Sequence, residues 1–282
     1  MLRKIALFVG YGLLALFIIA FAGVIWGALV FTNLRTTPRF PWCLPALLVV
    51  LWLLWEYLGG KGWPRSTGER RRHLRRANRV SRAGFGWTAL AGAFAIAALA
   101  GIWIVFFQLF RMPPNRLAAP DFGSAQLLAA AVIAGASLLA PIVEETAVRG
   151  YLQKTLESQF APVTAVVLSS IVFALAHVSQ GVDWPRLLLY FLVGVTFGTM
   201  AYLNDSILPV IPVHIAGDIT FFLLIWPHDA TRKLVWEAGA DRWFWLHVAQ
   251  AVGFALLTVV AFRRLTRVQK APASVMAASA VR

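Results

Sequence analysis

The sequence predicts an all-α fold, a polytopic bundle of about eight transmembrane helices with both termini inside the cell. Hydrophobic residues make up 60% of the 282 residues and charged residues only 13%, and the mean hydropathy is +0.72. Because soluble domains carry roughly 25% charged residues, this composition places the chain in a membrane. Its length suits one compact bundle.

Uncharged or nearly uncharged runs mark the predicted spans, each near the 20 residues or so that a transmembrane helix needs. The runs are Ile5–Phe31, Pro41–Leu58, Phe85–Phe110, Phe122 to about Leu156, Pro162–Val178, Leu187–Leu203, Ile207–Trp226 and Trp243–Phe262. The second is the weakest, because it carries Glu56. The first exceeds the roughly 7–15 apolar residues of a signal peptide, so it is interpreted as a true span.

The basic residues lie between the spans and at the ends of the chain. With the N-terminus inside, 17 Lys and Arg residues face the cytoplasm and 8 face the other side, as the positive-inside rule requires. The loop 61–82 holds nine of them against one acid, Glu69. We expect this loop to contact anionic lipid. The net charge of +14 therefore indicates topology and not a nucleic-acid partner. Cys43 is the single cysteine, which excludes a disulfide framework and a cysteine-based zinc site.

Two adjacent glutamates, Glu144 and Glu145, lie inside the fourth predicted span. One charge at the centre of a bilayer costs roughly 2.5–3.5 kcal/mol, so such residues usually carry a function. Glu145 and Arg149 are four residues apart and can form an ion pair along one helix face. Neighbouring helix residues point about 100° apart, which leaves Glu144 as the free carboxylate.

His177 is expected to lie at the same depth as Glu144. The fourth and fifth spans form a hairpin that turns near 159–162, where Pro162 suits the start of a helix. Glu144 is 17 residues before position 161 and His177 is 16 residues after it. At about 1.5 Å per residue, both lie about 25 Å from the tip of the hairpin.

A third polar pair follows two prolines, Pro209 and Pro212, which make the start of the seventh span irregular. Irregular backbone at membrane depth is tolerated where it lines a cavity or is buried in protein. His214 and Asp218 are four residues apart on one helix face, where the carboxylate can orient the imidazole.

Each polar group also has a structural interpretation when it is taken alone. The glutamates and Arg149 could form only an ion pair, and His177 or His214 could be packing residues with one hydrogen bond. His247 has no acidic residue at i+4 and is interpreted as structural. The agreement in depth between Glu144 and His177 favours a site, because independent packing residues need not align.

These motifs resemble those of the CPBP family of intramembrane proteases, which includes the CAAX prenyl endopeptidases of the Ras-converting type and abortive-infection-like proteins. The family pattern is Glu-Glu-x-x-x-Arg, Phe-x-x-x-His and His-x-x-x-Asn/Asp on successive helices. Here it reads Glu144-Glu145-Thr-Ala-Val-Arg149, Phe173-Ala-Leu-Ala-His177 and His214-Ile-Ala-Gly-Asp218. The resemblance covers roughly Ala125–Trp226. Asp218 stands where the prenyl endopeptidases have asparagine, which favours a role as acceptor from His214.

The resemblance implies hydrolysis of a peptide bond within the membrane. Glu144 with His177 would activate a water. His214, steadied by Asp218, would stabilise the oxyanion or protonate the leaving amine. Arg149 and Glu145 would hold the helix and could contact a substrate carboxylate. Whether a metal takes part stays open: Glu144, His177 and His214 could bind zinc, but there is no His-Glu-x-x-His, and we favour chemistry without an obligatory metal.

The expected organisation has three regions: N-terminal spans in 1–120 with the basic loop 59–84, the catalytic core in 121–230, and a last span with a basic tail in 231–282. The expected partners are the lipid bilayer and a membrane-associated peptide or protein. A CAAX-like substrate follows from the resemblance only. The expected location is a bacterial inner (plasma) membrane.

Two other classes of function stay open. One is a catalytically silent immunity or scaffold protein that uses the same polar core for stability or binding. The other is a proton-coupled transporter, against which stands the lack of an internal repeat.

Overall fold

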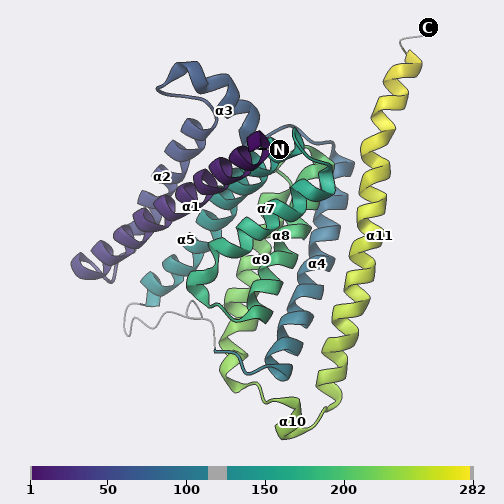
Figure 1. Ribbon diagram of the computed structural model, residues 1–282. Coiled ribbons are helices and arrows are strands. Elements are labelled where there is room, and N and C mark those ends of the chain that lie inside the picture. The colour runs from purple at the N-terminus through teal and green to yellow at the C-terminus, as the bar shows by residue number, and fades with distance from the viewer. Residues whose placement is uncertain (1, 114–125, 280–282) are drawn as a thin grey trace.

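Helices form every regular element that the computed structural model describes, which covers residues 2–113 and 126–279, with side chains described as far as Lys270. In chain order the elements are α1 (Leu2–Thr36), α2 (Cys43–Leu58), η1 (Arg65–Thr67), α3 (Gly68–Arg75), α4 (Arg82–Leu109), α5 (Gln126–Glu144), η2 (Glu145–Gln153), α6 (Lys154–Glu157), α7 (Pro162–Ala176), η3 (Val178–Gln180), α8 (Trp184–Asn204), α9 (Val210–Thr220), η4 (Phe221–Ile225), η5 (Trp226–Thr231), α10 (Val235–Ala238) and α11 (Arg242–Ser279). The predicted all-α fold class is confirmed (Figure 1).

Seven helices of the described residues are long and apolar enough to cross a membrane, so the chain is a multi-pass membrane protein. The remaining predicted span, the second in the chain, is present as α2, whose 16 residues extend only about 24 Å against a hydrocarbon core of about 30 Å. The predicted start of the fourth span at Phe122 lies outside the described residues. The start of α1, the basic helix α3 and the C-terminal half of α11 lie at one end of the bundle (Figure 1), as the charge distribution predicted.

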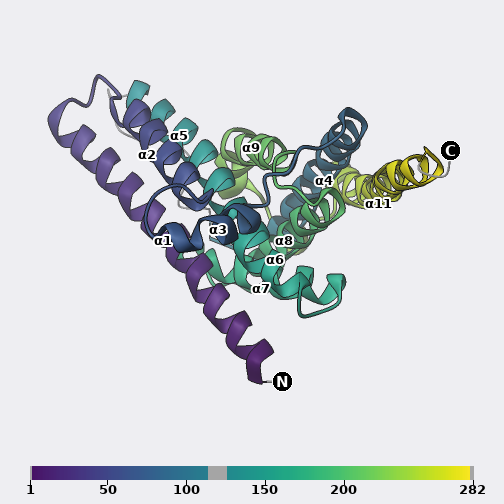
Figure 2. The same ribbon diagram turned by 90° about the horizontal axis from the view of Figure 1, so that it is seen from above.

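The helices that carry the motifs pack around one another in the middle of the bundle. Seen from the end that carries α3, α9 lies between α5 and α4, and α7 and α8 lie across from it (Figure 2). Two glycines let α8 approach its neighbours: a Cβ at Gly194 would lie 2.8 Å from Ser170 Cβ on α7, and one at Gly198 would lie 2.8 Å from Gln153 Oε1 on η2. Both contacts lie within the chain, so the glycine pair allows close packing of helices inside the bundle.

The helix that carries the two glutamates changes its hydrogen-bond pattern at Glu145. It is α-helical as far as Glu144 and π-helical from Glu145 to Gln153. A π-helix closes its turns with i→i+5 bonds and occurs mostly at functional sites. This change was not predicted, because an α-helical rise was assumed throughout the span.

The basic loop is fixed to this π-helix by Arg76, which is 1% exposed and follows α3 in a left-handed conformation with φ of 57°. Its guanidinium bonds Glu157 Oε1 at 2.9 Å and Asp205 Oδ1 at 3.1 Å, and it lies 3.4 Å from the carbonyl oxygen of Arg149. Its own carbonyl accepts a bond from the backbone N–H of Ile207 at 2.9 Å. The loop is therefore a structural part of the core and not only a surface segment.

A side chain at Gly150 is expected to disturb this contact, because its Cβ would lie 2.6 Å from the carbonyl oxygen of Leu74. The backbone at Leu74 and the π-helix that carries Gly150 have little room to move apart. Gly150→Ala should therefore lower the free energy of unfolding by about 1–3 kcal/mol. Thermal unfolding in detergent measures the effect. The matched control is Gly86→Ala on α4, where nothing lies within 4 Å of the added Cβ; there the change should be neutral or stabilising by up to about 1 kcal/mol. Equal unfolding temperatures for the two variants would contradict the close approach.

Candidate active site

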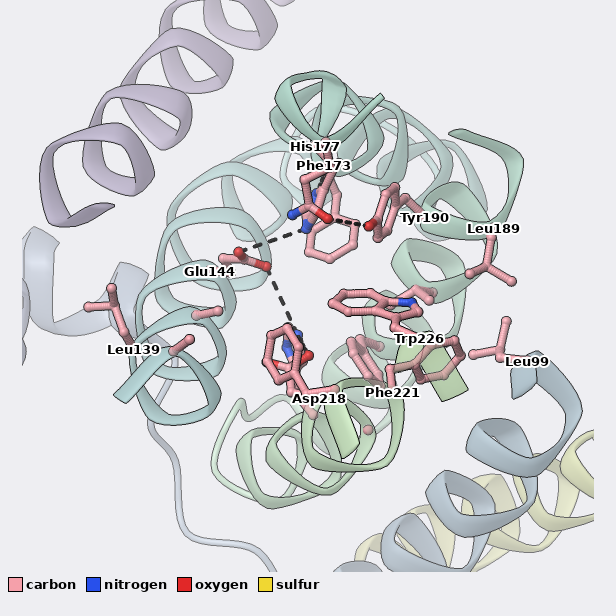
Figure 3. Close-up of a pocket in the computed structure, with 18 of the residues that line it drawn as sticks. Leu99, Leu139, Glu144, Phe173, His177, Leu189, Tyr190, Asp218, Phe221 and Trp226 are labelled. Carbon is pink, nitrogen blue, oxygen red and sulfur yellow. Dashed lines mark hydrogen bonds and ion pairs between the residues drawn. The ribbon is translucent and has the colours of Figure 1, made fainter. Parts of the chain in front are cut away.

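Glu144 lies between two histidines that come from different helices, and Figure 3 shows it facing His177. Its Oε1 is 3.9 Å from His177 Nε2, at the end of α7, and its Oε2 is 4.0 Å from His214 Nε2, on α9. Glu144 is 7% exposed and His214 is 5% exposed. The agreement in depth that the hairpin count predicted is thus confirmed, and the third motif joins the same place.

His177 presents a lone pair to Glu144. Its Nδ1 lies 2.8 Å from the backbone carbonyl oxygen of Phe173, and because a carbonyl only accepts, Nδ1 carries the hydrogen. In the neutral ring Nε2 is then the acceptor. Tyr190, on α8, stacks on the other side of the imidazole with ring centroids 4.2 Å apart. The ring is therefore held in both position and tautomer.

The carboxylate that orients His214 is Glu145, and this corrects the assignment of that role to Asp218. His214 Nδ1 lies 2.9 Å from Glu145 Oε1, whereas Asp218 Oδ1 lies 3.6 Å from His214 Nε2, beyond hydrogen-bond range. Asp218 instead faces the same ring nitrogen as Glu144 does. Asp218, one turn along α9, was predicted as the partner of His214, but the hydrogen bond is made by Glu145 on η2.

Arg149 pairs with Glu145 as predicted, with Nη1 3.2 Å from Oε1. The arginine is 1% exposed and Glu145 is fully buried. The guanidinium carbon lies 4.2 Å from the ring centroid of Phe173 and 5.6 Å from that of Phe197, so two aromatic faces hold the cation. Glu145 thus links Arg149 and His214 in one buried polar chain.

The three candidate zinc ligands lie together but do not fit a zinc ion. Tetrahedral zinc with bonds of about 2.0–2.2 Å needs ligand atoms about 3.3–3.6 Å apart. Glu144 lies 3.9 Å from His177 and 4.0 Å from His214. Within residues 2–113 and 126–270 no group of three or more His, Cys, Asp or Glu side chains is arranged to hold a metal ion. The zinc set that the sequence allowed is therefore not supported by the donor geometry.

Glu144, His177, His214 and Asp218 form one wall of a cavity of about 290 Å³. The remaining wall is almost entirely apolar, and Figure 3 shows Trp226 and Phe221 across the cavity from Glu144. The apolar lining comes from α1, α4, α5, α7, α8, α9 and the segment after α9. Such a cavity can hold an apolar group beside a small polar centre.

Sequence reasoning missed three aromatic residues of this site. Tyr190 stacks on His177, Phe197 lies 4.6 Å from the ring centroid of His214, and Trp226 lines the cavity. Tyr190 and Phe197 are seven residues apart, about two helical turns, so they share a face of α8, and this spacing could have indicated them. His247 pairs with Gln250 Oε1 at 3.0 Å on α11 and does not line the cavity.

In the comparison with protein-family models, residues 126–220 match the type II CAAX prenyl endopeptidase Rce1-like family. No curated protein and no solved structure matches the chain. The matched segment begins with α5 and ends with α9, so it contains the three motifs and the wall of polar residues described above. The predicted resemblance is confirmed over this segment, which matches the type II CAAX prenyl endopeptidase Rce1-like family.

Proposed function

We propose that this protein is an intramembrane endopeptidase that hydrolyses a peptide bond in a membrane-associated substrate. The observation that carries the proposal is the position of the Glu144 carboxylate between two imidazoles, at 3.9 and 4.0 Å, on the wall of an apolar cavity. The family supports a CAAX-type protease in general.

Glu144 and His177 together suit a water molecule as the nucleophile. An ionised carboxylate and an imidazole lone pair are both acceptors, and 3.9 Å is too long for a direct hydrogen bond. A water placed between them donates one O–H to Glu144 Oε1 and the other to His177 Nε2. As its oxygen attacks the scissile carbonyl carbon, Glu144 takes the proton as general base.

His214 acts on the other side of the reacting carbon. With Nδ1–H held by Glu145, its Nε2–H donates to the carbonyl oxygen as negative charge develops there. When the C–N bond breaks, the proton on Glu144 passes to the leaving nitrogen, which gives a carboxylic acid and an amine. Arg149 balances the charge of Glu145, and the Asp218 carboxylate, 3.6 Å from His214 Nε2, attracts Nε2–H electrostatically without a direct hydrogen bond.

The apolar cavity indicates the class of substrate. A peptide that carries a large apolar group on the cytoplasmic side of a membrane, such as a CAAX-like sequence, fills the cavity and brings its backbone to Glu144. The cytoplasmic face of a bacterial inner membrane is the expected place. The test is purified protein in proteoliposomes with membrane-anchored quenched peptides, with the products identified by mass spectrometry. Cleavage within the peptide supports the proposal, and intact peptide with every anchor tested would refute it.

Cleavage is expected to be insensitive to metal chelation, because the site residues are not spaced as zinc ligands. Activity should stay within about twofold after incubation with a strong chelator and after addition of zinc, since the chemistry needs only Glu144 and the two histidines. Metal analysis of the same sample by mass spectrometry checks that chelation was complete. Loss of activity on chelation with recovery on adding zinc would establish a metalloprotease instead.

A further inference from the structure

A polar pocket and an apolar groove meet on the side of the bundle along which α11 runs (Figure 1). The polar pocket lies between the end of α3, α6, the end of α8 and α11. The apolar groove lies between α7, α8 and α11. Tyr202, Leu203 and Thr266 line both of them, so we call the two together the α8–α11 site. Among the described residues it shares no lining residue with the catalytic cavity.

The face of α11 in this site changes from apolar to basic towards the C-terminal end of the helix. Val259 and Phe262 line the apolar groove, and Lys270 lines the polar pocket. Arg263 and Thr266 lie between them in sequence, and spacings of three and four residues keep these positions on one side of the helix. The C-terminal half of α11 lies at the end of the bundle that carries α3 (Figure 1). The two cations therefore lie on the cytoplasmic side of the apolar groove.

Helices α7 and α8 supply the opposite wall, which is apolar in the depth of the membrane. Val166 and Val167 on α7 and Val195 on α8 line it. The hydroxyl of Thr199 donates to the carbonyl oxygen of Val195 at 2.7 Å, so this polar group is satisfied within its own helix. Tyr202 follows at the junction with the polar pocket and is 40% exposed. Because tyrosine is enriched where the hydrocarbon core meets the headgroups, the junction marks that level of the membrane.

Four cations line the α8–α11 site against two carboxylates, and both carboxylates are already paired. Arg76 lies 2.9 Å from Glu157 and 3.1 Å from Asp205, and Lys154 lies 2.6 Å from Asp205. The two cations on α11 are exposed and form no salt bridge with a residue that the structure describes. The outward grooves between α4 and α9 and between α2, α5 and α9 have only uncharged lining residues. Positive charge therefore distinguishes this site from them.

We propose that the α8–α11 site binds one anionic phospholipid of the cytoplasmic leaflet, with its headgroup in the polar pocket and an acyl chain along the apolar groove. Basic pockets between transmembrane helices on the cytoplasmic side bind acidic lipid headgroups. The unpaired cations on α11 attract the phosphate, and the apolar groove that continues from them holds the attached chain. A zwitterionic lipid would bring a cation of its own beside them. The inference goes beyond the proposed function and does not depend on it.

Selective binding of an anionic lipid tests the proposal. Native mass spectrometry in detergent, with phosphatidylglycerol and phosphatidylcholine of the same acyl chains, measures the affinity for the first bound lipid. Phosphatidylglycerol should bind at least about fivefold more tightly, since one basic residue near an acidic lipid surface contributes about fivefold. Arg263→Gln with Lys270→Gln should weaken its binding by about tenfold or more. The matched control, Arg72→Gln with Arg264→Gln, removes two exposed charges outside the site and should weaken binding by less than about threefold.

The apolar part of the site is tested by filling the groove. Val167→Trp should weaken phosphatidylglycerol binding by about threefold or more, because the acyl chain loses packing contacts. Leu48→Trp, an exposed lining position of the groove between α2, α5 and α9, is the control and should leave the affinity unchanged. Unfolding temperatures without added lipid should match that of the wild type for all four variants. Added phosphatidylglycerol should raise the unfolding temperature of the wild type, because a ligand of the folded state stabilises it.

Three results would each overturn the proposal. The first is equal affinity for phosphatidylglycerol and phosphatidylcholine. The second is an equal loss of affinity in the two double variants, which would mean that only the total charge matters. The third is displacement of the lipid by an equal concentration of glycerol phosphate, which would make the occupant of the polar pocket a soluble anion.

Discussion

The Glu144→Gln variant is expected to lose peptide cleavage by about 10²–10⁴-fold, the usual contribution of a general base. The amide is nearly isosteric and keeps the contacts of the buried side chain, but it cannot take the proton of a water that lies between Glu144 and His177. Initial rates with the membrane-anchored quenched peptide measure the loss. Size-exclusion elution and thermal unfolding in detergent should match those of the wild type.

Glu56→Gln is the matched control for that variant. Glu56 lies on α2 and pairs with Lys61 at the end of the basic loop, away from the cavity, so its activity should stay within about twofold of the wild type, as for most surface changes. A folded Glu144→Gln protein with full activity would remove Glu144 from the chemistry. If neither the wild type nor Glu144→Gln cleaved any substrate, the result would favour the catalytically silent scaffold protein. If the wild type showed proton-linked transport and Glu144→Gln lost it, the result would favour the proton-coupled transporter.

The Arg149→Met variant is expected to be the least stable single substitution of the site. Removal of the cation leaves Glu145 fully buried with its bond to His214 but without the arginine, and breaking a buried ion pair in this way costs about 3–5 kcal/mol. It also removes the cation that lies over the Phe173 ring. Unfolding in mixed micelles, followed by far-UV circular dichroism, measures the change in free energy.

The double variant Glu145→Gln with Arg149→Met tests the cause. Because no charge is then left unpaired, it should recover much of the stability that Arg149→Met loses. Its peptide cleavage should nevertheless be slower than that of the wild type, because the bond from His214 Nδ1 to a carboxylate is gone. Arg72→Met, at an exposed position of α3, is the control and should change stability by less than about 0.5 kcal/mol. An Arg149→Met protein as stable as the wild type would contradict a structural pair.

The sequence was sufficient to predict which residues meet, but not which of them bond. Glu144 and His177 were placed at one depth by counting from the hairpin tip, because the rise of a helix is nearly constant, and their side chains lie 3.9 Å apart. The bond between His214 and Glu145 spans 69 residues of sequence. It depends on how far each helix is turned about its own axis, which hydrophobic patterning specifies only coarsely.

The role of the basic loop shows the same limit. Its charge predicted a contact with anionic lipid, and most of its basic side chains are indeed exposed. Arg76 behaves differently because it follows the end of α3 in a left-handed turn and points back into the protein, towards Glu157 and Asp205. Nothing in a run of nine basic residues distinguishes Arg76 from the others, since its acidic partners lie more than 80 positions away.

Because the segment from Glu145 to Gln153 is a π-helix, the direction in which Glu144 points depends on how tightly this segment is wound. Each turn closed by an i→i+5 bond contains one residue more than an α-helical turn, so the segment contains more residues than an α-helix with the same number of turns. If the same nine residues closed as an α-helix, each would turn by about 100°, which is more than in the wider π-helix. The helix that carries Glu144 would then be rotated about its own axis relative to the hairpin. The sequence would still contain both glutamates, both histidines and their local spacing, yet the carboxylate of Glu144 would face away from the cavity.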